Sequence, residues 1–205
     1  MGRGLYIILE GFEGGGKTTH SRLLKGYFNQ KGLPCVSVRE PGGTRVGEQI
    51  RRILLDRDTE INPRTELYLF GAARAQIFSE IVIPSLEEGI HVISDRGYIS
   101  TEAYQHYGRG VAMGVVKGMN QAATFGTKPD LVFMLGVSAE KGVQMATVKN
   151  RFEGESSEFH QKVVEGYTKI AKRDRNIITT INYREGDIEG MQQEIRGHVD
   201  QKLAA

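Results

Sequence analysis

Short apolar runs alternate along the chain with longer stretches in which apolar residues recur every three or four positions. The short runs are typical of buried strands and lie at residues 5–9, 35–38, 90–94, 131–137 and 176–182. The longer stretches have the spacing of amphipathic helices and lie at residues 19–31, 46–55, 62–86, 111–125, 159–172 and 187–203, with another helix beginning at 100–105. This alternation predicts an α/β fold, a doubly wound five-stranded parallel sheet with helices on both faces.

A glycine-rich stretch follows the first apolar run and precedes the first predicted helix. Residues 11–18 read GFEGGGKT and match the pattern G-x-x-x-x-G-K-[ST] in the required context of strand, loop and helix. Backbone N–H groups without side chains can converge on phosphate oxygens, and the following helix points its positive end at the same place. An ordinary glycine-rich turn is the alternative, and the Lys-Thr pair at the correct offset argues against it. We predict a nucleoside triphosphate site formed by Gly11, Phe12, Glu13, Gly14, Gly15, Gly16, Lys17, Thr18 and Thr19.

Lys17 and Thr18 have separate chemical roles in such a loop. Lys17 supplies a mobile cation for the outer phosphates, and the Thr18 hydroxyl suits a ligand of Mg²⁺. A bound nucleoside triphosphate with Mg²⁺ is therefore the first functional prediction from this sequence.

The composition narrows the classes of partner and compartment. At 205 residues the chain is predicted to form one domain, 1–205, with a sizeable core. The 27 basic and 25 acidic residues nearly balance, which argues against nucleic acid or a membrane surface as the main partner. Lone Cys35 fits a reducing compartment, and its apolar neighbours predict a buried small hydrophobe. The first apolar run is too short for a signal peptide and no stretch approaches a membrane span, so we expect a cytoplasmic enzyme.

Charged residues follow the second and third predicted strands. Arg39 and Glu40 lead into the turn Pro-Gly-Gly-Thr, and Asp95 and Arg96 end the third strand. Ligands of parallel sheets bind at the carboxyl ends of strands, so these residues are candidates for the site. Asp95 can serve a metal and Arg96 a phosphate. A solvated turn and a structural ion pair between Asp95 and Arg96 are the alternatives.

Proline residues mark the limits of the longest predicted helix. Asn62 can cap it with Pro63 at its first position, and Pro84 predicts a kink or an end near its C terminus. Phe70 and Arg74 lie four residues apart and share one face of this helix. Together they can stack on a base and hydrogen-bond its edge. Taken alone, the pair is more often a core phenylalanine and a solvated arginine.

The order and spacing of these motifs together resemble the thymidylate kinases, bacterial type, among the P-loop nucleoside monophosphate kinases. The likeness runs from end to end of the chain and thins after Val137. The stretches that carry it are Gly11–Thr18, Glu40–Thr44 with Gly47–Arg51, Phe70 with Arg74–Gln76, Asp95-Arg96 with Ser100–Gln105, Tyr107–Gly110 and Lys128–Leu131.

The resemblance implies a P-loop fold with a small lid, here at about 138–160, and usually a homodimer. It implies transfer of the γ-phosphoryl group of ATP to dTMP with Mg²⁺, giving dTDP for dTTP synthesis. On this likeness Phe70 would stack on thymine, while Arg74 and Gln105 would hydrogen-bond its edge. Tyr104 would crowd the 2′ position, Glu13 would hold the 3′-hydroxyl and Arg96 would grip the acceptor phosphate. The acceptor-binding set implied is Glu13, Glu40, Phe70, Arg74, Arg96, Ser100, Thr101, Tyr104 and Gln105.

The expected lid is poor in arginine, although the P-loop has none either. Between residues 138 and 160 the cations are Lys141, Lys149 and Arg151, against four glutamates. We hypothesise that Arg151 folds over the γ-phosphate with Lys149 assisting, because charge on the transferring phosphoryl group needs a cation on its solvent side. The alternative is that Arg151 pairs with Glu153 or Glu155. The predicted catalytic set is Lys17, Asp95, Arg96 and Arg151, with Thr18 as metal ligand.

Other P-loop proteins remain as alternatives. One is a kinase for another nucleoside monophosphate, and another is a regulatory protein that binds nucleotide without transfer. A switch GTPase or motor ATPase is the third. The chain lacks the Asn-Lys-x-Asp guanine signature, and its candidate partner strand ends in Asp95-Arg96 rather than Asp-Glu.

Overall fold

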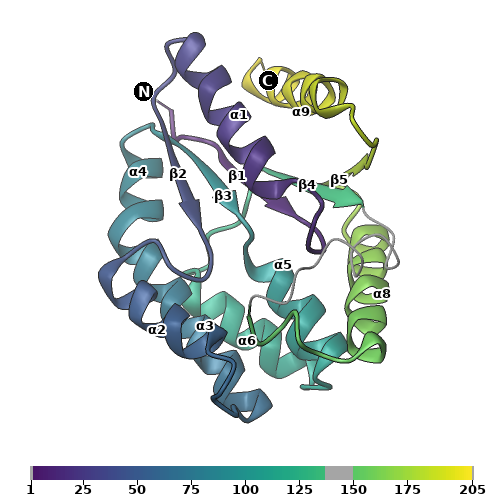
Figure 1. Cartoon of the computed structure of the whole chain (residues 1–205). Coiled ribbons are helices and arrows are strands. Elements are labelled where there is room, and N and C mark those ends of the chain that lie inside the picture. Colours follow the sequence, from purple (N-terminus) through teal and green to yellow (C-terminus); the bar gives the residue numbers. More distant parts are fainter. Residues whose placement is uncertain (1, 137–149, 205) are drawn as a thin grey trace.

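The sheet consists of five parallel strands in the order β2-β3-β1-β4-β5 in the computed structural model, which describes residues 2–136 and 150–204 (Figure 1). β1 lies at the centre, where Ile7 registers with Ile93 of β3 and with Leu131 of β4. This arrangement confirms the predicted α/β fold. The strands are β1 (Tyr6–Glu10), β2 (Cys35–Arg39), β3 (His91–Asp95), β4 (Leu131–Gly136) and β5 (Ile178–Asn182).

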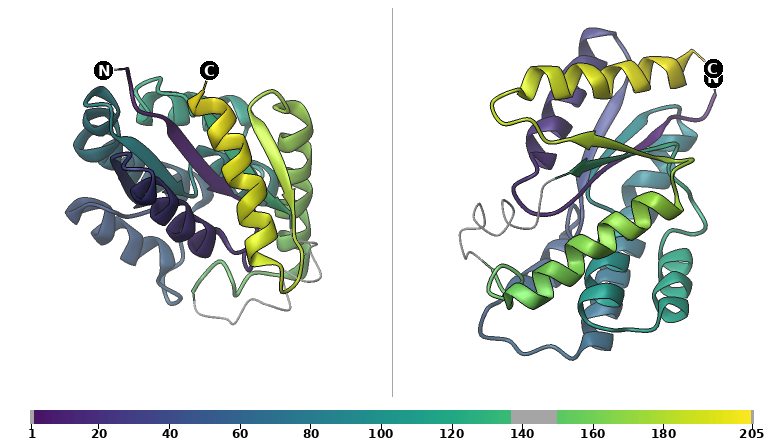
Figure 2. Two further views of the ribbon diagram at one scale, coloured as in Figure 1. Left: turned by 90° about the horizontal axis from the view of Figure 1, so that it is seen from above. Right: turned by 90° about the vertical axis from the view of Figure 1, so that its right-hand side faces the viewer.

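Helices cover both faces of the sheet, as predicted for a doubly wound fold. On one face lie α1 (Lys17–Gln30) and α9 (Ile188–Leu203). The opposite face carries the other helices (Figure 2). They are α2 (Arg45–Leu55), α3 (Pro63–Ile77), the π-helical turn η1 (Phe78–Val82), α4 (Ile83–Glu87), α5 (Tyr98–Thr101), the π-helical segment η2 (Glu102–Gly108), α6 (Met113–Ala123) and α8 (Ser157–Arg173).

Alternating residues of the central strand build the two cores. Ile7 and Leu9 pack with α1 and α9, whereas Ile8 packs with η1, α5 and α8 on the other face. A strand points successive side chains to opposite faces, so a continuous apolar run is needed where both faces are covered. The apolar run from Leu5, predicted as a buried strand, lies at the centre of the sheet, where both of its faces are covered.

The longest predicted helix differs in form from the expectation. It runs from Pro63 to Glu87 as α3, η1 and α4 in succession. Pro84 cannot donate a backbone hydrogen bond, and the wider π-helical turn lies directly before it. Pro84 lies in the first turn of α4, and the helix ends at Glu87, three residues later, close to the predicted end. In a similar way, the helix predicted from residue 100 begins at Tyr98 and becomes π-helical at Glu102.

Two smaller expectations need correction. The first helix begins at Lys17, two residues before the predicted start. Cys35 is only half-buried, because β2 is the edge strand of the sheet formed by the described residues. Its thiol lies near the carbonyl oxygen of Lys25 and the Asn29 amide oxygen. Within residues 2–136 and 150–204, no helix is both long and apolar enough to cross a membrane.

Candidate active site

Three of the four glycines in residues 11–18, the P-loop, adopt backbone conformations that favour glycine. Gly11, Gly14 and Gly16 have φ values of 131°, 76° and 82°, a region that residues with a Cβ rarely adopt. A Cβ on Gly11 would lie 2.4 Å from the carbonyl oxygen of Leu135. α1 then begins at Lys17 without any side chain capping its N terminus. The first N–H groups of this 14-residue helix are therefore free to bind an anion.

Lys17 is buried, and its side chain folds back onto the glycine-rich loop that precedes it. Its Nζ donates to the carbonyl oxygen of Phe12 at 2.7 Å. Burial lowers the pKa of Lys17 to about 7, with repulsion by Arg96 acting in the same direction and Glu13 and Asp95 opposing it. The ammonium is held at the loop, close to where phosphates would bind.

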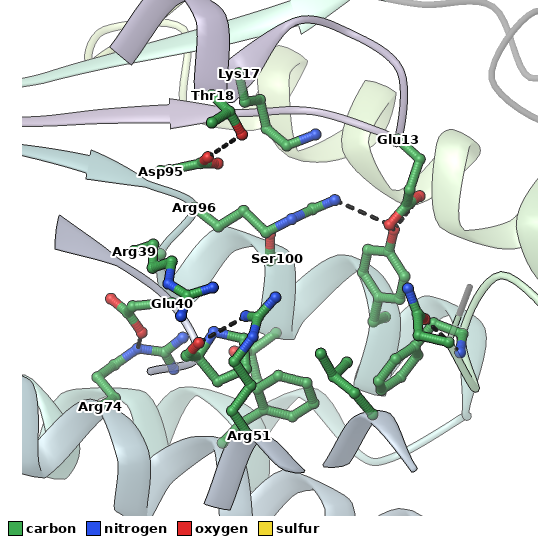
Figure 3. A pocket seen from close by; sticks show the side chains of 18 of the residues that line it. Glu13, Lys17, Thr18, Arg39, Glu40, Arg51, Arg74, Asp95, Arg96 and Ser100 are labelled. Atoms are coloured by element: carbon green, nitrogen blue, oxygen red, sulfur yellow. Dashed lines mark hydrogen bonds and ion pairs between the residues drawn. The ribbon is translucent and has the colours of Figure 1, made fainter. Parts of the chain in front are cut away.

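Thr18 and Asp95 meet across two elements at the carboxyl edge of the sheet. The Thr18 hydroxyl donates to Asp95 Oδ2 at 2.5 Å (Figure 3). Leu9 near the end of β1 registers with Asp95 of β3, so the end of β3 lies beside the loop that leads from β1 into α1. A hydroxyl and a carboxylate oxygen are ligands of the type that Mg²⁺ takes.

Arg96 has a backbone conformation that only a well-supported residue can hold. Its φ is 70°, in the left-handed region. Its Nη2 donates to Glu13 Oε1 at 2.9 Å, whereas the neighbouring Asp95 accepts from Thr18. The two strand-end residues thus serve different partners, which is not the structural ion pair considered as the alternative.

Glu10, which the sequence analysis did not single out, supports the turn that carries Arg96. Its side chain is fully buried at the end of β1. Oε1 accepts from the backbone N–H groups of Gly97 and Ser100 at 2.8 and 3.0 Å. Oε2 accepts from the Ser100 hydroxyl at 2.7 Å. Burial raises the pKa of Glu10, while Arg96 and Ser100 oppose this. Its position in an apolar strand directly before the P-loop was the available signal.

Glu13 joins the P-loop to the far wall of the site. Both of its carboxylate oxygens accept from the Tyr104 hydroxyl at 2.6 Å, in addition to the bond from Arg96. Burial raises the pKa of Glu13, but Arg96, Lys17 and the Tyr104 hydroxyl outweigh it, so the net shift is downward. Glu13 is therefore an anionic acceptor facing the cavity.

A cavity of about 410 Å³ runs from the P-loop to α3 and η2. Arg74 and Phe70 both line it. The Arg74 side chain is 1% exposed, so the alternative of a solvated arginine is wrong. Its Nε donates to Glu40 Oε2 at 2.6 Å and its Nη1 to Asn120 Oδ1 at 2.7 Å. Phe70 is half-buried and its ring lies 5.8 Å from that of Phe152. Phe70 packs against the hydrophobic core as well as lining the cavity, so only the solvated-arginine part of the alternative is wrong.

Three buried polar atoms of cavity residues have no hydrogen-bond partner. They are Glu40 Oε1, Thr101 Oγ1 and Gln105 Oε1. Buried polar atoms in folded proteins are almost always paired, so these three atoms are candidates to bind polar groups of a ligand. All three belong to residues that the sequence analysis named.

Comparison with known proteins decides the family. The family model described as thymidylate kinase matches residues 9–195. The chain belongs to the thymidylate kinase family. It is 40% identical over 200 residues to a thymidylate kinase of Caldanaerobacter subterraneus subsp. tengcongensis, covering 96% of this chain and 92% of the relative. A relative of the same name from a Thermoanaerobacter species is 38% identical, with 97% and 95% covered.

The solved structures agree. The crystal structure of thymidylate kinase from Ehrlichia chaffeensis superposes with a TM-score of 0.81 at 32% identity, covering 98% of this chain and all of that one. Members of the thymidylate kinase family are nucleoside monophosphate kinases, so the site has to hold two phosphate-bearing molecules.

Two further arginines line the cavity in a way that suits a thymidylate kinase. Arg39 and Arg51 lie with Arg96 between the P-loop and Arg74 (Figure 3). Arg51 Nη1 donates to the Pro41 carbonyl oxygen at 2.7 Å, and Arg39 Nη2 donates to both oxygens of Glu48 at 2.9 Å. The sequence analysis named Arg39 as a candidate because of its place at a strand end, whereas Arg51 was quoted only as part of the family resemblance.

Arg151 contacts residues of α2 and α3. Its Nη1 is 2.7 Å from Glu66 Oε2, and its Nε donates to the Leu54 carbonyl oxygen at 3.1 Å. Its neighbour Phe152 lines the cavity. Glu155, considered as an alternative partner, pairs with Arg109 at 2.5 Å. The rest of the predicted lid, 138–149 with Lys141 and Lys149, lies outside the described residues. Placement of Arg151 over the γ-phosphate stays a prediction.

Proposed function

We propose that this protein transfers the γ-phosphoryl group of ATP to dTMP, giving dTDP and ADP. One observation carries the proposal: a single cavity joins a P-loop to a wall with unpaired base-reading atoms, with three arginines between them. ATP supplies the phosphoryl group and dTMP accepts it. We expect a cytoplasmic homodimer, as in the family, with neither nucleic acid nor membrane as partner.

The chemical problem is electrostatic rather than one of proton transfer. The acceptor phosphate has a second pKa near ~6, so it is largely dianionic at neutral pH and needs no general base. Two anions must meet in line, and catalysis then rests on positioning and on cations at the transferring oxygens. Arg96, Arg39 and Arg51 hold the acceptor phosphate. Lys17 leaves the Phe12 carbonyl oxygen for the outer phosphates of ATP.

Mg²⁺ fits the pair formed by Thr18 and Asp95. Among the residues that the structure describes, no three carboxylate, imidazole or thiolate groups form a dedicated metal cluster. Mg²⁺ usually binds through one or two protein ligands together with waters and substrate phosphates. The Thr18 hydroxyl and the Asp95 carboxylate would hold it. The ion would neutralise charge on the triphosphate.

The base and the sugar are read on the far side of the cavity. Phe70 stacks on thymine, and Arg74 donates to its O4 carbonyl. Thr101 and Gln105 offer unpaired oxygens to the N3–H group of the base.

The sugar meets Tyr104, Ser100 and Glu13. Tyr104 leaves no room for a 2′-hydroxyl, and Glu13 accepts from the 3′-hydroxyl. Ser100 accepts from Arg96 Nη1 at 3.2 Å and keeps this guanidinium aimed at the acceptor phosphate.

A coupled assay of ATP against dTMP, dCMP, dGMP and AMP tests the proposal. We expect rapid ADP formation with dTMP and little with the other three acceptors. Equal use of several monophosphates would support a kinase of another specificity. ADP formation that does not depend on an acceptor would support a switch or motor ATPase, and either result overturns the proposal.

A further inference from the structure

We propose that Glu66, a residue outside the cavity lining, sets base specificity by fixing the orientation of the Gln105 side-chain amide. The proposal rests on the proposed function, since it concerns the base of the acceptor. Glu66 lies on α3 and Gln105 on η2, and both side chains are fully buried. Glu66 is thus a positioning residue that acts through Gln105.

The contact between the two side chains leaves one orientation of the amide. Gln105 Nε2 donates to Glu66 Oε1 at 2.8 Å. A carboxylate only accepts hydrogen bonds, so the NH₂ group of the amide has to face Glu66 and the carbonyl oxygen has to face the other way. That oxygen, Oε1, is the buried atom without a partner in a residue that lines the cavity.

Glu66 is held chiefly by Arg109, and Arg151 adds a second contact. Arg109 donates to both of its oxygens at 3.2 Å, and Arg151 Nη1 lies 2.7 Å from Oε2. Arg109 is anchored in turn by Glu155 and by the face of Phe159, 4.5 Å from its guanidinium carbon. Two guanidinium groups hold the carboxylate in place, and a carboxylate accepts a stronger hydrogen bond from the amide than a neutral acceptor would.

A fixed carbonyl oxygen distinguishes pyrimidines by the chemistry at N3. Thymine and uracil carry an N3–H donor, which Gln105 Oε1 can accept. Cytosine has an unprotonated N3, which the same oxygen repels. A released amide could rotate by half a turn and donate its NH₂ group to cytosine N3. Holding the amide therefore converts a side chain that tolerates both bases into one that rejects cytosine.

Glu66→Gln tests the assignment, because a glutamine at 66 can donate as well as accept and so permits both amide orientations. We would measure kcat/KM for dTMP, dUMP and dCMP on one preparation of each enzyme. Where dCMP turnover is too slow to follow, its competitive inhibition constant against dTMP takes its place. We expect the preference for dTMP over dCMP to fall by about tenfold or more, the scale of one misdirected hydrogen bond. The preference for dTMP over dUMP should stay within about twofold, since both bases carry N3–H.

These ratios separate specificity from folding. A ratio measured on one sample does not depend on the fraction of folded enzyme, so a purely structural role for Glu66 would leave both ratios unchanged. Glu102→Gln is the matched control, because it removes a buried carboxylate of the same helical segment that pairs with Arg173 rather than with Gln105. It should change neither ratio.

Gln105→Leu keeps the proposal testable if Glu66→Gln folds poorly. It should lower the preference for dTMP over dCMP as much as Glu66→Gln does, and the double variant should lower it no further. An unchanged preference in either single variant overturns the role of Glu66. A wild-type enzyme that uses dCMP as well as dTMP would instead overturn the proposed function.

Discussion

Replacing Arg74 with alanine should lower the free energy of unfolding and weaken the binding of dTMP. The Arg74 and Glu40 side chains are 1% and 5% exposed, and their charged atoms lie 2.6 Å apart. Removing one partner of a buried pair strands the other charge, which typically costs about 3–5 kcal/mol. Because so little of the pair is exposed, solvent screening does not reduce this figure. It is a large part of a total stability of roughly 5–15 kcal/mol.

The same variant should show a pH dependence of definite sign. Burial already raises the pKa of Glu40, and Arg74 opposes this. Without Arg74 the pKa of folded Glu40 rises further above its unfolded value of about 4.3. The folded state then binds more protons than the unfolded state between these two values, so stability falls as pH rises. The slope reaches about 1.4 kcal/mol per pH unit, and the penalty should be smaller at pH 5 than at pH 8.

Urea unfolding at pH 5 and pH 8 measures the effect, with each variant compared to wild type at the same pH. Arg74→Ala with Glu40→Gln should recover part of the loss and abolish the extra pH dependence. Arg39→Ala removes an exposed ion pair and should cost at most about 1 kcal/mol. In kinetics, Arg74→Ala should raise KM for dTMP far more than for ATP. A loss below about 1 kcal/mol that is equal at both pH values would refute the reasoning.

Three further variants test the catalytic half of the site. Lys17→Ala should abolish phosphoryl transfer in a folded protein, and transfer within about tenfold of wild type, ~1.4 kcal/mol in barrier, would contradict the P-loop assignment. If Tyr104 crowds the 2′ carbon, ribo-TMP should be a poor acceptor for the wild type and a better one for Tyr104→Ala. Equal turnover of ribo-TMP by the wild type and the variant would contradict that role of Tyr104. Arg151→Ala should lower kcat about hundredfold at saturating substrates, which corresponds to ~2.7 kcal/mol in the activation barrier. An unchanged kcat would mean that Arg151 makes no transition-state contact.

The sequence predicted those parts of the site that depend on local spacing and on parallel topology. The P-loop is contiguous, and its match to a motif needs no tertiary knowledge. Asp95 could be placed beside it because strand ends of a parallel sheet meet at one edge. The spacing of Phe70 and Arg74 predicted that the two share one helix face. It did not predict that Arg74 is buried.

Other features depend on partners far away in the chain. Tyr167, which donates to Glu10, lies 157 residues after it, and Glu66 meets Gln105 only because η2 packs on α3. A glutamate in a helix looks the same whether it is solvated or buried between arginines. Arg151 could be paired on sequence only with nearby glutamates, whereas its partner Glu66 comes from α3. The π-helical turns η1 and η2 could not be predicted from the spacing of apolar residues. One extra residue in a helical turn looks the same in the sequence as a break in that spacing.

The burial that lowers the pKa of Lys17 predicts that ATP binding takes up a proton from the solvent. With a pKa of about 7, Lys17 of the free protein is about nine-tenths neutral at pH 8. The phosphates of ATP favour its charged form, so at pH 8 the complex should take up nearly one proton, and at pH 6 almost none. Calorimetry of MgATP binding in buffers of different ionisation enthalpy measures this number directly. Lys17→Arg, whose guanidinium does not titrate, should bind ATP without the uptake. Wild-type affinity for ATP would therefore weaken above pH 7 through the proton that Lys17 must first regain.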